Sequence, residues 1–265
     1  MKIVVPIKQV PETSNVKMDP KTGTMVREGV ESIINPLDLY AIEEAIKLKE
    51  KSGGQVIVIS MGPEKALEAI KEAIAMGCDD GVLLSDKKFA GSDTWATSCV
   101  LAHAIKKIGD FDLVICGERA TDGDTGQVGP GIASFLDLPL STFTSEIISI
   151  DEGKIQVRRL VEGGYEELEL KLPAVLTVVK EISDPRLPTL RGKLRAKGVE
   201  IPVWGPQDIG VDEENIGLKG SPTRVVKIFT PKVTREGEMI TVNDEKSLEE
   251  AVDKIMEFLI KKELI

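Results

Sequence analysis

Residues 55–77, QVIVISMGPEKALEAIKEAIAMG, contain the two patterns that decide the fold. The first six residues contain four consecutive β-branched apolar side chains, Val56–Ile59, which is typical of a buried strand. From Pro63 to Met76, apolar side chains recur at helical spacing, and Gly77 follows as a helix stop. A buried strand that leads directly into an amphipathic helix is the unit from which parallel α/β sheets are built.

The same alternation continues on both sides of this stretch. Further short apolar runs, each typical of a buried strand, occupy residues 2–7, 81–84 and 112–116. Helical patterns begin at Pro36, Thr94 and Gln127, and Asn35 before Pro36 is a favourable N-cap. Because strand–helix–strand connections are right-handed, this order predicts a mostly parallel sheet with helices on both faces.

The pattern changes after about residue 140. Residues 143–171 alternate polar and apolar side chains around two turns, which predicts an antiparallel hairpin inserted before an apolar strand at 174–179. Six prolines then interrupt the chain until an amphipathic helix at 247–261. We expect an α/β domain over 1–180 and an extended arm over 181–265 that ends in this helix. The arm's apolar residues have no core of their own and predict packing on another chain.

Composition excludes several classes of function. A net charge of −10 with 4% aromatic residues argues against nucleic acid as a partner. The three cysteines form no CxxC pair and the chain has one histidine, so we expect neither a metal site nor a dithiol redox centre. No apolar run approaches 18 residues and no targeting signal is evident, so we expect no membrane span. Free thiols are typical of the reducing cytoplasm, where we expect the protein to reside.

Residues 117–129, GERATDGDTGQVG, are the strongest candidate for a binding site. They join the strand at 112–116 to a helix, at the sheet edge where ligands of parallel sheets bind, and free N–H groups at a helix start suit a phosphate. The loop matches neither the dinucleotide nor the triphosphate fingerprint, and its three carboxylates oppose a simple anion hole. A calcium loop fails at its twelfth position, Ala133. The residues alone leave a nucleotide site and a purely structural glycine loop as equal alternatives.

A basic stretch interrupts the acidic chain at residues 180–197, where six Lys and Arg residues stand against Glu181 and Asp184. Two interpretations are open. The stretch is either a solvated arm or a docking surface for an acidic partner or a flavin phosphate.

Several motifs in the same order resemble the β subunit of electron-transfer flavoproteins along essentially the whole chain. The most specific is VRRLVEGGYEELELKLPAVLT at 157–177. KQVP at 8–11, NP at 35–36, MGP at 61–63 and the loop at 122–129 also look like this family.

The resemblance implies a Rossmann-like subunit that pairs with a larger α subunit carrying FAD and that binds an adenine nucleotide in its own sheet crevice. Matched residue by residue, it implies cofactor contacts at Pro6, Asn35, Pro36, Leu37, Asp38, Met61, Gly117, Glu118, Arg119, Ala120, Thr121, Asp122, Gly123, Asp124, Thr125, Gly126, Gln127 and Val128. It also implies a loop at 186–190, with Leu190 as its anchor, that docks partner dehydrogenases or quinone- or ferredoxin-linked subunits. No catalytic residue is implied, because the flavin carries the redox step.

The family has two branches that differ in this nucleotide. Housekeeping members hold a structural AMP in the β subunit, whereas electron-bifurcating members bind a second FAD there and accept electrons from NADH. The stretches that look more like the bifurcating branch are 19–24, 29–36, 123–130, 192–197 and 220–223. We therefore expect FAD and an NADH-oxidising electron-carrier subunit, with AMP as the alternative. A nucleotide-binding regulatory module of similar fold is the alternative from another class.

Overall fold

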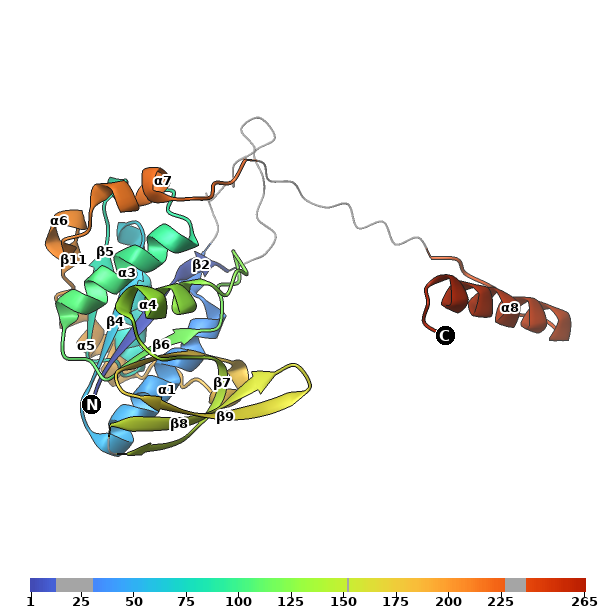
Figure 1. Ribbon diagram of the computed structural model, residues 1–265, viewed down its shortest axis with the longest axis horizontal. Coiled ribbons are helices and arrows are strands. Elements are labelled where there is room, and N and C mark those ends of the chain that lie inside the picture. Colours follow the sequence, from blue (N-terminus) through green and yellow to red (C-terminus); the bar gives the residue numbers. More distant parts are fainter. Residues whose placement is uncertain (13–30, 152, 227–236) are drawn as a thin grey trace. The chain divides into compact units, whose positions relative to one another are not determined.

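The computed structural model describes residues 1–12, 31–151, 153–226 and 237–265. The chain divides into two compact units, Met1–Lys227 and Ile228–Ile265. The first unit is built on a nine-stranded sheet in the order β11-β5-β4-β1-β6-β10-β7-β8-β9 (Figure 1). The strands are β1 Lys2–Ile7, β4 Gln55–Met61, β5 Asp80–Leu84, β6 Leu113–Gly117, β7 Leu140–Asp151, β8 Lys154–Val161, β9 Gly164–Lys171, β10 Ala174–Val178 and β11 Val203–Trp204.

Pairing within the sheet is parallel from β11 to β7 and antiparallel between β7, β8 and β9. A separate antiparallel pair, β2 Gln9–Pro11 and β3 Ser32–Ile34, lies just beyond the end of β1 and just before the first helix. The predicted class, a mostly parallel α/β sheet with an antiparallel hairpin and a C-terminal helix, is confirmed.

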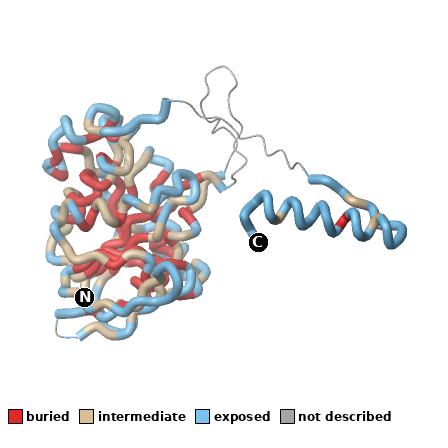
Figure 2. The backbone as a smooth tube through the Cα atoms, turned by 45° about the vertical axis from the view of Figure 1, so that its right-hand side comes forward, coloured by how far each residue is buried: buried red, intermediate tan, exposed pale blue. Residues whose placement is uncertain are grey.

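Helices cover both faces of the sheet, because alternate strand residues point to opposite sides. Ile3, Val5 and Ile7 of β1 belong to the core formed with α1 (Pro36–Ser52) and α2 (Leu67–Met76). Val4 belongs to the core on the other face, with α3 (Thr94–Ile108) and α4 (Val128–Leu136). Both cores are continuous with the buried centre of the sheet (Figure 2). Short 3-10 turns, η1 Glu64–Ala66 and η2 Lys87–Phe89, precede α2 and α3.

Residues 180–221 contain more regular structure than their proline-punctuated sequence predicts. They form η3 Lys180–Ile182, α5 Leu190–Gly198, α6 Pro206–Ile209, η4 Glu213–Asn215 and α7 Gly217–Gly220, and β11 extends the sheet beside β5. Helix α5 lies directly on α2, since a Cβ at Gly192 would stand 2.0 Å from the carbonyl oxygen of Ala75. The Arg195 guanidinium also donates to the carbonyl oxygen of Ile74 at 3.1 Å. These contacts are tertiary, which explains why local periodicity gave no sign of them.

The second unit contains α8 (Glu245–Lys261), which confirms the predicted C-terminal helix. Asp244 caps it by accepting the N–H of Ser247 at 2.8 Å. Its apolar residues Leu248, Val252, Ile255 and Phe258 are about half exposed, and Figure 2 shows the helix as exposed along nearly its whole length. In the described part of the chain, no helix is both long and apolar enough to span a membrane.

Candidate nucleotide-binding site

The order of the strands reverses between β1 and β6. From β1 the chain moves outward through β4 to β5, and it then returns to place β6 on the other side of β1. In open α/β sheets, ligands bind in the crevice beyond the carboxyl ends of the strands at such a reversal. The two segments that leave this edge begin at Lys8, after β1, and at Glu118, after β6. The predicted site loop, residues 117–128, is the second of them.

Asn35 connects three segments at this edge. It is fully buried and occupies the N-cap position of α1, with Pro36 at N1 as the sequence predicts. Its side chain makes no capping bond, however; Nδ2 donates to the carbonyl oxygen of Arg119 at 2.9 Å, and Oδ1 accepts the N–H of Thr121 at 3.1 Å. Its own N–H donates to the carbonyl oxygen of Lys8 at 2.8 Å. Asn35 therefore braces the loop against the ends of β1 and α1.

Asp38, in the first turn of α1, makes a second connection. Its Oδ2 accepts the backbone N–H of Lys8 at 2.7 Å. Burial raises the pKa of Asp38 from 3.8 to about 7, and hydrogen bonds from backbone N–H groups of Lys8 and Gly117 oppose that rise. A Cβ at Gly117 would stand 2.4 Å from Asp38 Oδ1, so only glycine allows β6 to end this close to α1. Asp38 contacts the backbone of both segments and so fixes their separation.

The loop beyond Gly117 is exposed from Thr121 to Thr125. It turns through two left-handed residues, Asp124 with φ 53° and Gly126 with φ 63°. Gly123 has ordinary φ, and a Cβ placed there would meet no atom within 4 Å. A glycine is required where the backbone has positive φ or where another atom approaches closely. Positive φ occurs at Gly126, whereas Gly123 faces open space and needs no unusual conformation.

Helix α4 begins where the loop ends. Pro130 has no N–H, and the N–H of Gly131 donates to the carbonyl oxygen of Gln127 at 2.9 Å. The first turn therefore offers a ligand at most the N–H groups of Val128 and Gly129. A Cβ at Gly129 would stand 2.4 Å from Thr177 Cγ2, so this helix start is packed directly on β10.

The loop's acidic side chains are paired with cations. Lys8 Nζ lies 2.7 Å from Asp122 Oδ1, and Arg119 Nε lies 2.9 Å from Asp124 Oδ1 and 3.6 Å from Glu118 Oε1. These pairs reduce the negative charge of the loop without cancelling it, because two cations lie among three carboxylates. Lys8 was not among the predicted site residues, although its position directly after the first strand was the available signal.

The remaining predicted positions lie along the same sheet edge. Pro6 is buried in β1 and stands in register with Ile59 of β4. Met61 ends β4, one residue beyond Ser60, which is in register with Ile7 at the end of β1. Leu37 lies beside Gly117, since a Cβ built on Gly117 would stand 2.8 Å from the carbonyl oxygen of Leu37. The structure therefore brings Asn35, Leu37 and Asp38 against the loop. It places Pro6 on the neighbouring strand β1 and Met61 at the end of β4, one strand farther away.

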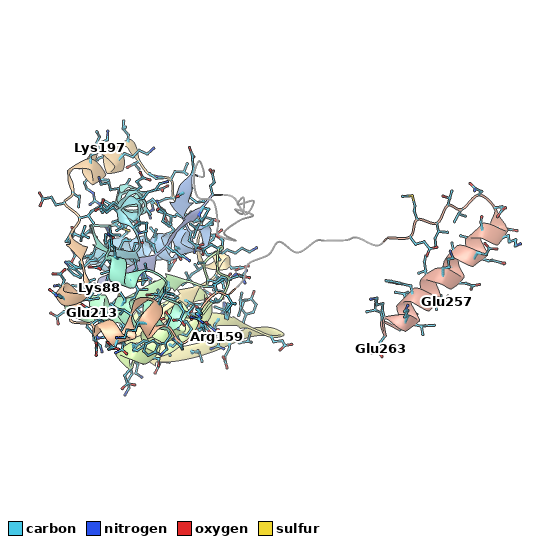
Figure 3. The ribbon with its side chains drawn as sticks, turned by 90° about the horizontal axis from the view of Figure 1, so that it is seen from above. Lys88, Arg159, Lys197, Glu213, Glu257 and Glu263 are labelled. Carbon is cyan, nitrogen blue, oxygen red and sulfur yellow. The ribbon has the colours of Figure 1, made fainter. Side chains whose placement is uncertain are left out.

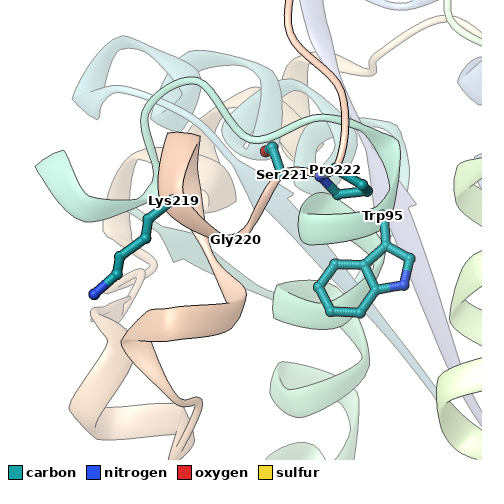
Figure 4. A pocket seen from close by; sticks show the side chains of 5 residues that line it. All are labelled: Trp95, Lys219, Gly220, Ser221 and Pro222. Atoms are coloured by element: carbon teal, nitrogen blue, oxygen red, sulfur yellow. The ribbon is translucent and has the colours of Figure 1, made fainter.

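An open pocket of ≈ 300 Å³ adjoins the start of α3, and sequence reasoning missed it. Trp95 lines it together with residues 219–222 (Figure 4). Asp93 connects these residues to α3, since its N–H donates to the Ser221 hydroxyl oxygen at 2.8 Å and its carboxylate accepts the N–H of Ala96 at 3.0 Å. Thr94 donates to Gln127 Oε1 at 2.9 Å and so connects this helix start to the end of the site loop.

The three cysteines are buried, and the single histidine, His103, is partly buried. Burial raises the pKa of the Cys116 thiol, which suppresses its reactive thiolate form. The His103 Nδ1 lies 2.8 Å from the carbonyl oxygen of Cys99, one turn earlier in the same helix. What the site offers a ligand is exposed backbone at 121–125 and the cations Lys8 and Arg119.

The chain is similar in sequence to one protein family over most of its length. The family model described as "Electron transfer flavoprotein domain" matches residues 22–209. The "Electron transfer flavoprotein subunit beta" of Thermoanaerobacterium thermosaccharolyticum is 48% identical over 256 residues, covering 96% of this chain and 98% of the relative. The "Caffeyl-CoA reductase-Etf complex subunit CarD" of Acetobacterium woodii is 49% identical over 242 residues, covering 91% of this chain and 92% of the relative.

A third relative, "Protein FixA" of Azotobacter vinelandii, is 45% identical over 260 residues, covering 95% of this chain and 92% of its own. The matches extend over nearly full length on both sides. Because the family model covers most of the chain and relatives at 45–49% identity match it over nearly its whole length, the chain belongs to the electron-transfer flavoprotein family as a β subunit.

Proposed function

We propose that this β subunit binds FAD in the crevice beyond β1 and β6 and, paired with an α subunit in the cytoplasm, relays electrons from NADH to acceptors in a bifurcating complex. The observation that carries the proposal is the loop at 117–128, which Asn35 braces at the strand reversal beside Lys8 and Arg119. A structural glycine loop would need the turn and the brace, but it would not need two cations gathered at an exposed tip.

The residues present fit a nucleotide. A pyrophosphate needs N–H donors and positive charge, and the site offers exposed backbone at 121–125, the start of α4, Lys8 and Arg119. When bound, a flavin supplies the redox chemistry, and the protein binds it, orients it and adjusts its potential. Asn35 and Asp38 hold the loop at a fixed distance from β1, which keeps the donors in position without a ligand.

The open hollow beside Trp95 is where we propose that the part of FAD absent from AMP extends. A dinucleotide extends well beyond a single phosphate, and Trp95, which lines this ≈ 300 Å³ space, directly follows Thr94, whose hydroxyl donates to Gln127 at the end of the loop. Its lining includes Gly220, Ser221 and Pro222, part of one of the stretches that resemble the bifurcating branch. AMP remains the alternative ligand and corresponds to the housekeeping branch, in which NADH is not the donor.

The α subunit is the first partner we propose, because the relatives are named as β subunits or as a subunit of a reductase complex. Within this chain, residues 181–265 are the proposed contact region. The apolar side chains of α8 are half exposed and unpartnered in the described part of the chain. Burying such a face against another subunit is the usual way in which an amphipathic helix is stabilised.

Leu190 is the proposed docking residue for partner dehydrogenases or for quinone- or ferredoxin-linked subunits. It is 77% exposed at the start of α5, with Leu194 62% exposed one turn later. The preceding loop is held by Arg186, whose guanidinium contacts Glu43 at 2.9 Å and also pairs with Glu50. An exposed leucine on a loop that is fixed in this way is suited to insertion into an apolar pocket of a partner.

Two measurements test this function. Anaerobic titration of the purified αβ complex with NADH should bleach its flavin absorbance, and a complex that NADH does not reduce would refute the proposed donor. A Leu190→Ala variant should transfer electrons to its dehydrogenase more slowly while retaining its nucleotides. Leu218→Ala, at a leucine that is 68% exposed on α7, is the matched control and should leave the rate unchanged.

A further inference from the structure

We propose that Lys8 is a phosphate-binding residue of the nucleotide site, and that Asp122 holds its ammonium group in place until a nucleotide phosphate displaces the carboxylate. This inference rests on the proposed function and adds to it a contact outside the loop, together with an internal competitor for that contact. Lys8 is the cation that joins the end of β1 to the loop, through the 2.7 Å pair with Asp122.

The backbone of Lys8 is fixed on both sides by the residues that brace the loop. Its N–H donates to Asp38 Oδ2 at 2.7 Å, and its carbonyl oxygen accepts the N–H of Asn35 at 2.8 Å. Its side chain, by contrast, is 48% exposed and reaches the exposed tip of the loop. A flexible arm on a fixed base is able to deliver a charge to a ligand while the base stays in place.

A phosphate is a stronger partner for this ammonium group than a carboxylate is. A Lys–carboxylate pair at the surface contributes little, because both groups lose hydration and rotamer freedom to form it. A nucleotide phosphate presents more acceptor oxygens and more negative charge at the same place. Lys8 carries three N–H donors, so it is able to turn to a phosphate beside the loop with a small movement of its side chain.

Asp122 then has two opposing effects. In the absence of nucleotide it keeps the Lys8 ammonium group at the mouth of the site, which avoids an unpaired cation there. When a phosphate arrives, the same carboxylate competes for Lys8 and repels the incoming negative charge. Arg119 and Asp124 repeat this arrangement at 2.9 Å, which shows that pairing of cation with carboxylate is a general feature of the loop.

The opposing effects give a test based on the sign of the change. The full-length chain, freed of bound nucleotide, is titrated calorimetrically with AMP, ADP and adenosine. Lys8→Met should weaken AMP binding roughly tenfold, which corresponds to about 1.4 kcal/mol, whereas Asp122→Asn should tighten it roughly twofold to threefold, the range expected from a weak surface pair. In the Lys8→Met background, Asp122→Asn should lose most of that gain, and Lys8→Arg should restore much of the affinity.

Controls separate a phosphate contact from a change in folding. Adenosine lacks the phosphate, so its affinity should not change in either variant. Lys88 of η2 and Glu213 of η4 form a matched surface pair, with exposed fractions of 48% and 50% (Figure 3). Lys88→Met and Glu213→Gln should therefore leave AMP binding unchanged.

Each outcome decides between alternatives. If Lys8 and Asp122 only hold the loop closed, both substitutions should weaken AMP, ADP and adenosine alike, which would overturn the inference. AMP binding that is unchanged in Lys8→Met would also overturn it while leaving the nucleotide site intact. A wild-type chain that binds none of the three compounds would refute the proposed site and this inference together.

Discussion

The backbone N–H of Thr121 donates to Oδ1 of Asn35 at 3.1 Å, across 86 residues of sequence. Together with the bond from Asn35 Nδ2 to the carbonyl oxygen of Arg119, it attaches the site loop to the start of α1 through one buried amide. Because one side chain binds both a donor and an acceptor of the loop, it fixes the orientation of the loop as well as its distance from the start of α1.

Asn35→Ala should therefore loosen the site loop. Both loop groups lose their partner, and one such loss typically costs about 1–3 kcal/mol, so a drop in unfolding free energy within that range is expected. Nucleotide affinity should fall by roughly tenfold, because the donors lose their fixed positions. Urea unfolding and nucleotide titration measure the two effects. Asn215→Ala, at an exposed asparagine of η4, is the control, and equal effects in both variants would contradict the brace.

Gly126→Val should release nucleotide without unfolding the sheet. Gly126 has φ 63°, and valine resists this left-handed conformation, so the loop must change its path. Gly123→Val is the comparison, because Gly123 has ordinary φ and a Cβ there meets nothing within 4 Å. Nucleotide retained after gel filtration should be lower for Gly126→Val than for Gly123→Val. Full retention by Gly126→Val would show that the turn does not shape the site.

The buried Asp38 carboxyl should make stability depend on pH. Its pKa is raised to about 7 in the folded chain from 3.8, so the folded state holds a proton that the unfolded state has released between those values. The contribution of Asp38 to the unfolding free energy therefore falls as pH rises from about 4 to about 7 and levels off above the folded pKa. Urea unfolding at several pH values should show this fall in wild type and a flatter curve in Asp38→Asn. If the unfolding free energies of wild type and Asp38→Asn fell with pH in parallel, the raised pKa would not belong to Asp38.

Deletion of residues 248–265 should reduce pairing with the α subunit more than it reduces the stability of the α/β unit. The deleted part carries most of α8, whose apolar residues are half exposed and which belongs to the second compact unit. Co-purification yield and thermal unfolding measure the two properties. Val252→Asp should reproduce the deletion's effect, and Glu250→Lys, outside the apolar face, should not. Normal pairing by the truncated chain would refute the proposed role of α8.

Much of this architecture is predictable from the sequence, because its signals are local. β-Branched runs gave β1, β4, β5 and β6, and helical spacing with glycine stops gave the helices between them. The alternating residues of the hairpin were equally clear. Residues 180–221 were not, since β11 has two residues and α6 has four, which is too short for any period to appear. Their structure depends on contacts such as that of Gly192 with Ala75.

At the site, too, local features were predictable and contacts between distant segments were not. The position and glycine content of the loop are visible in the sequence, and Asn35 was recognised as a helix N-cap. Its use as a brace was not, because the partner groups lie more than 80 residues away. The pairing of Lys8 with Asp122 likewise requires the sheet to bring β1 beside β6. Sequence reasoning found the segments that meet at the site, and the fold shows which side chains join them.

The most direct test of the central claim is the nucleotide content of the purified αβ complex after denaturation, measured by absorbance and mass spectrometry. The proposed crevice predicts two FAD per heterodimer, one of them lost selectively in Gly126→Val. One FAD with one AMP per heterodimer would contradict the FAD assignment and place the protein in the housekeeping branch.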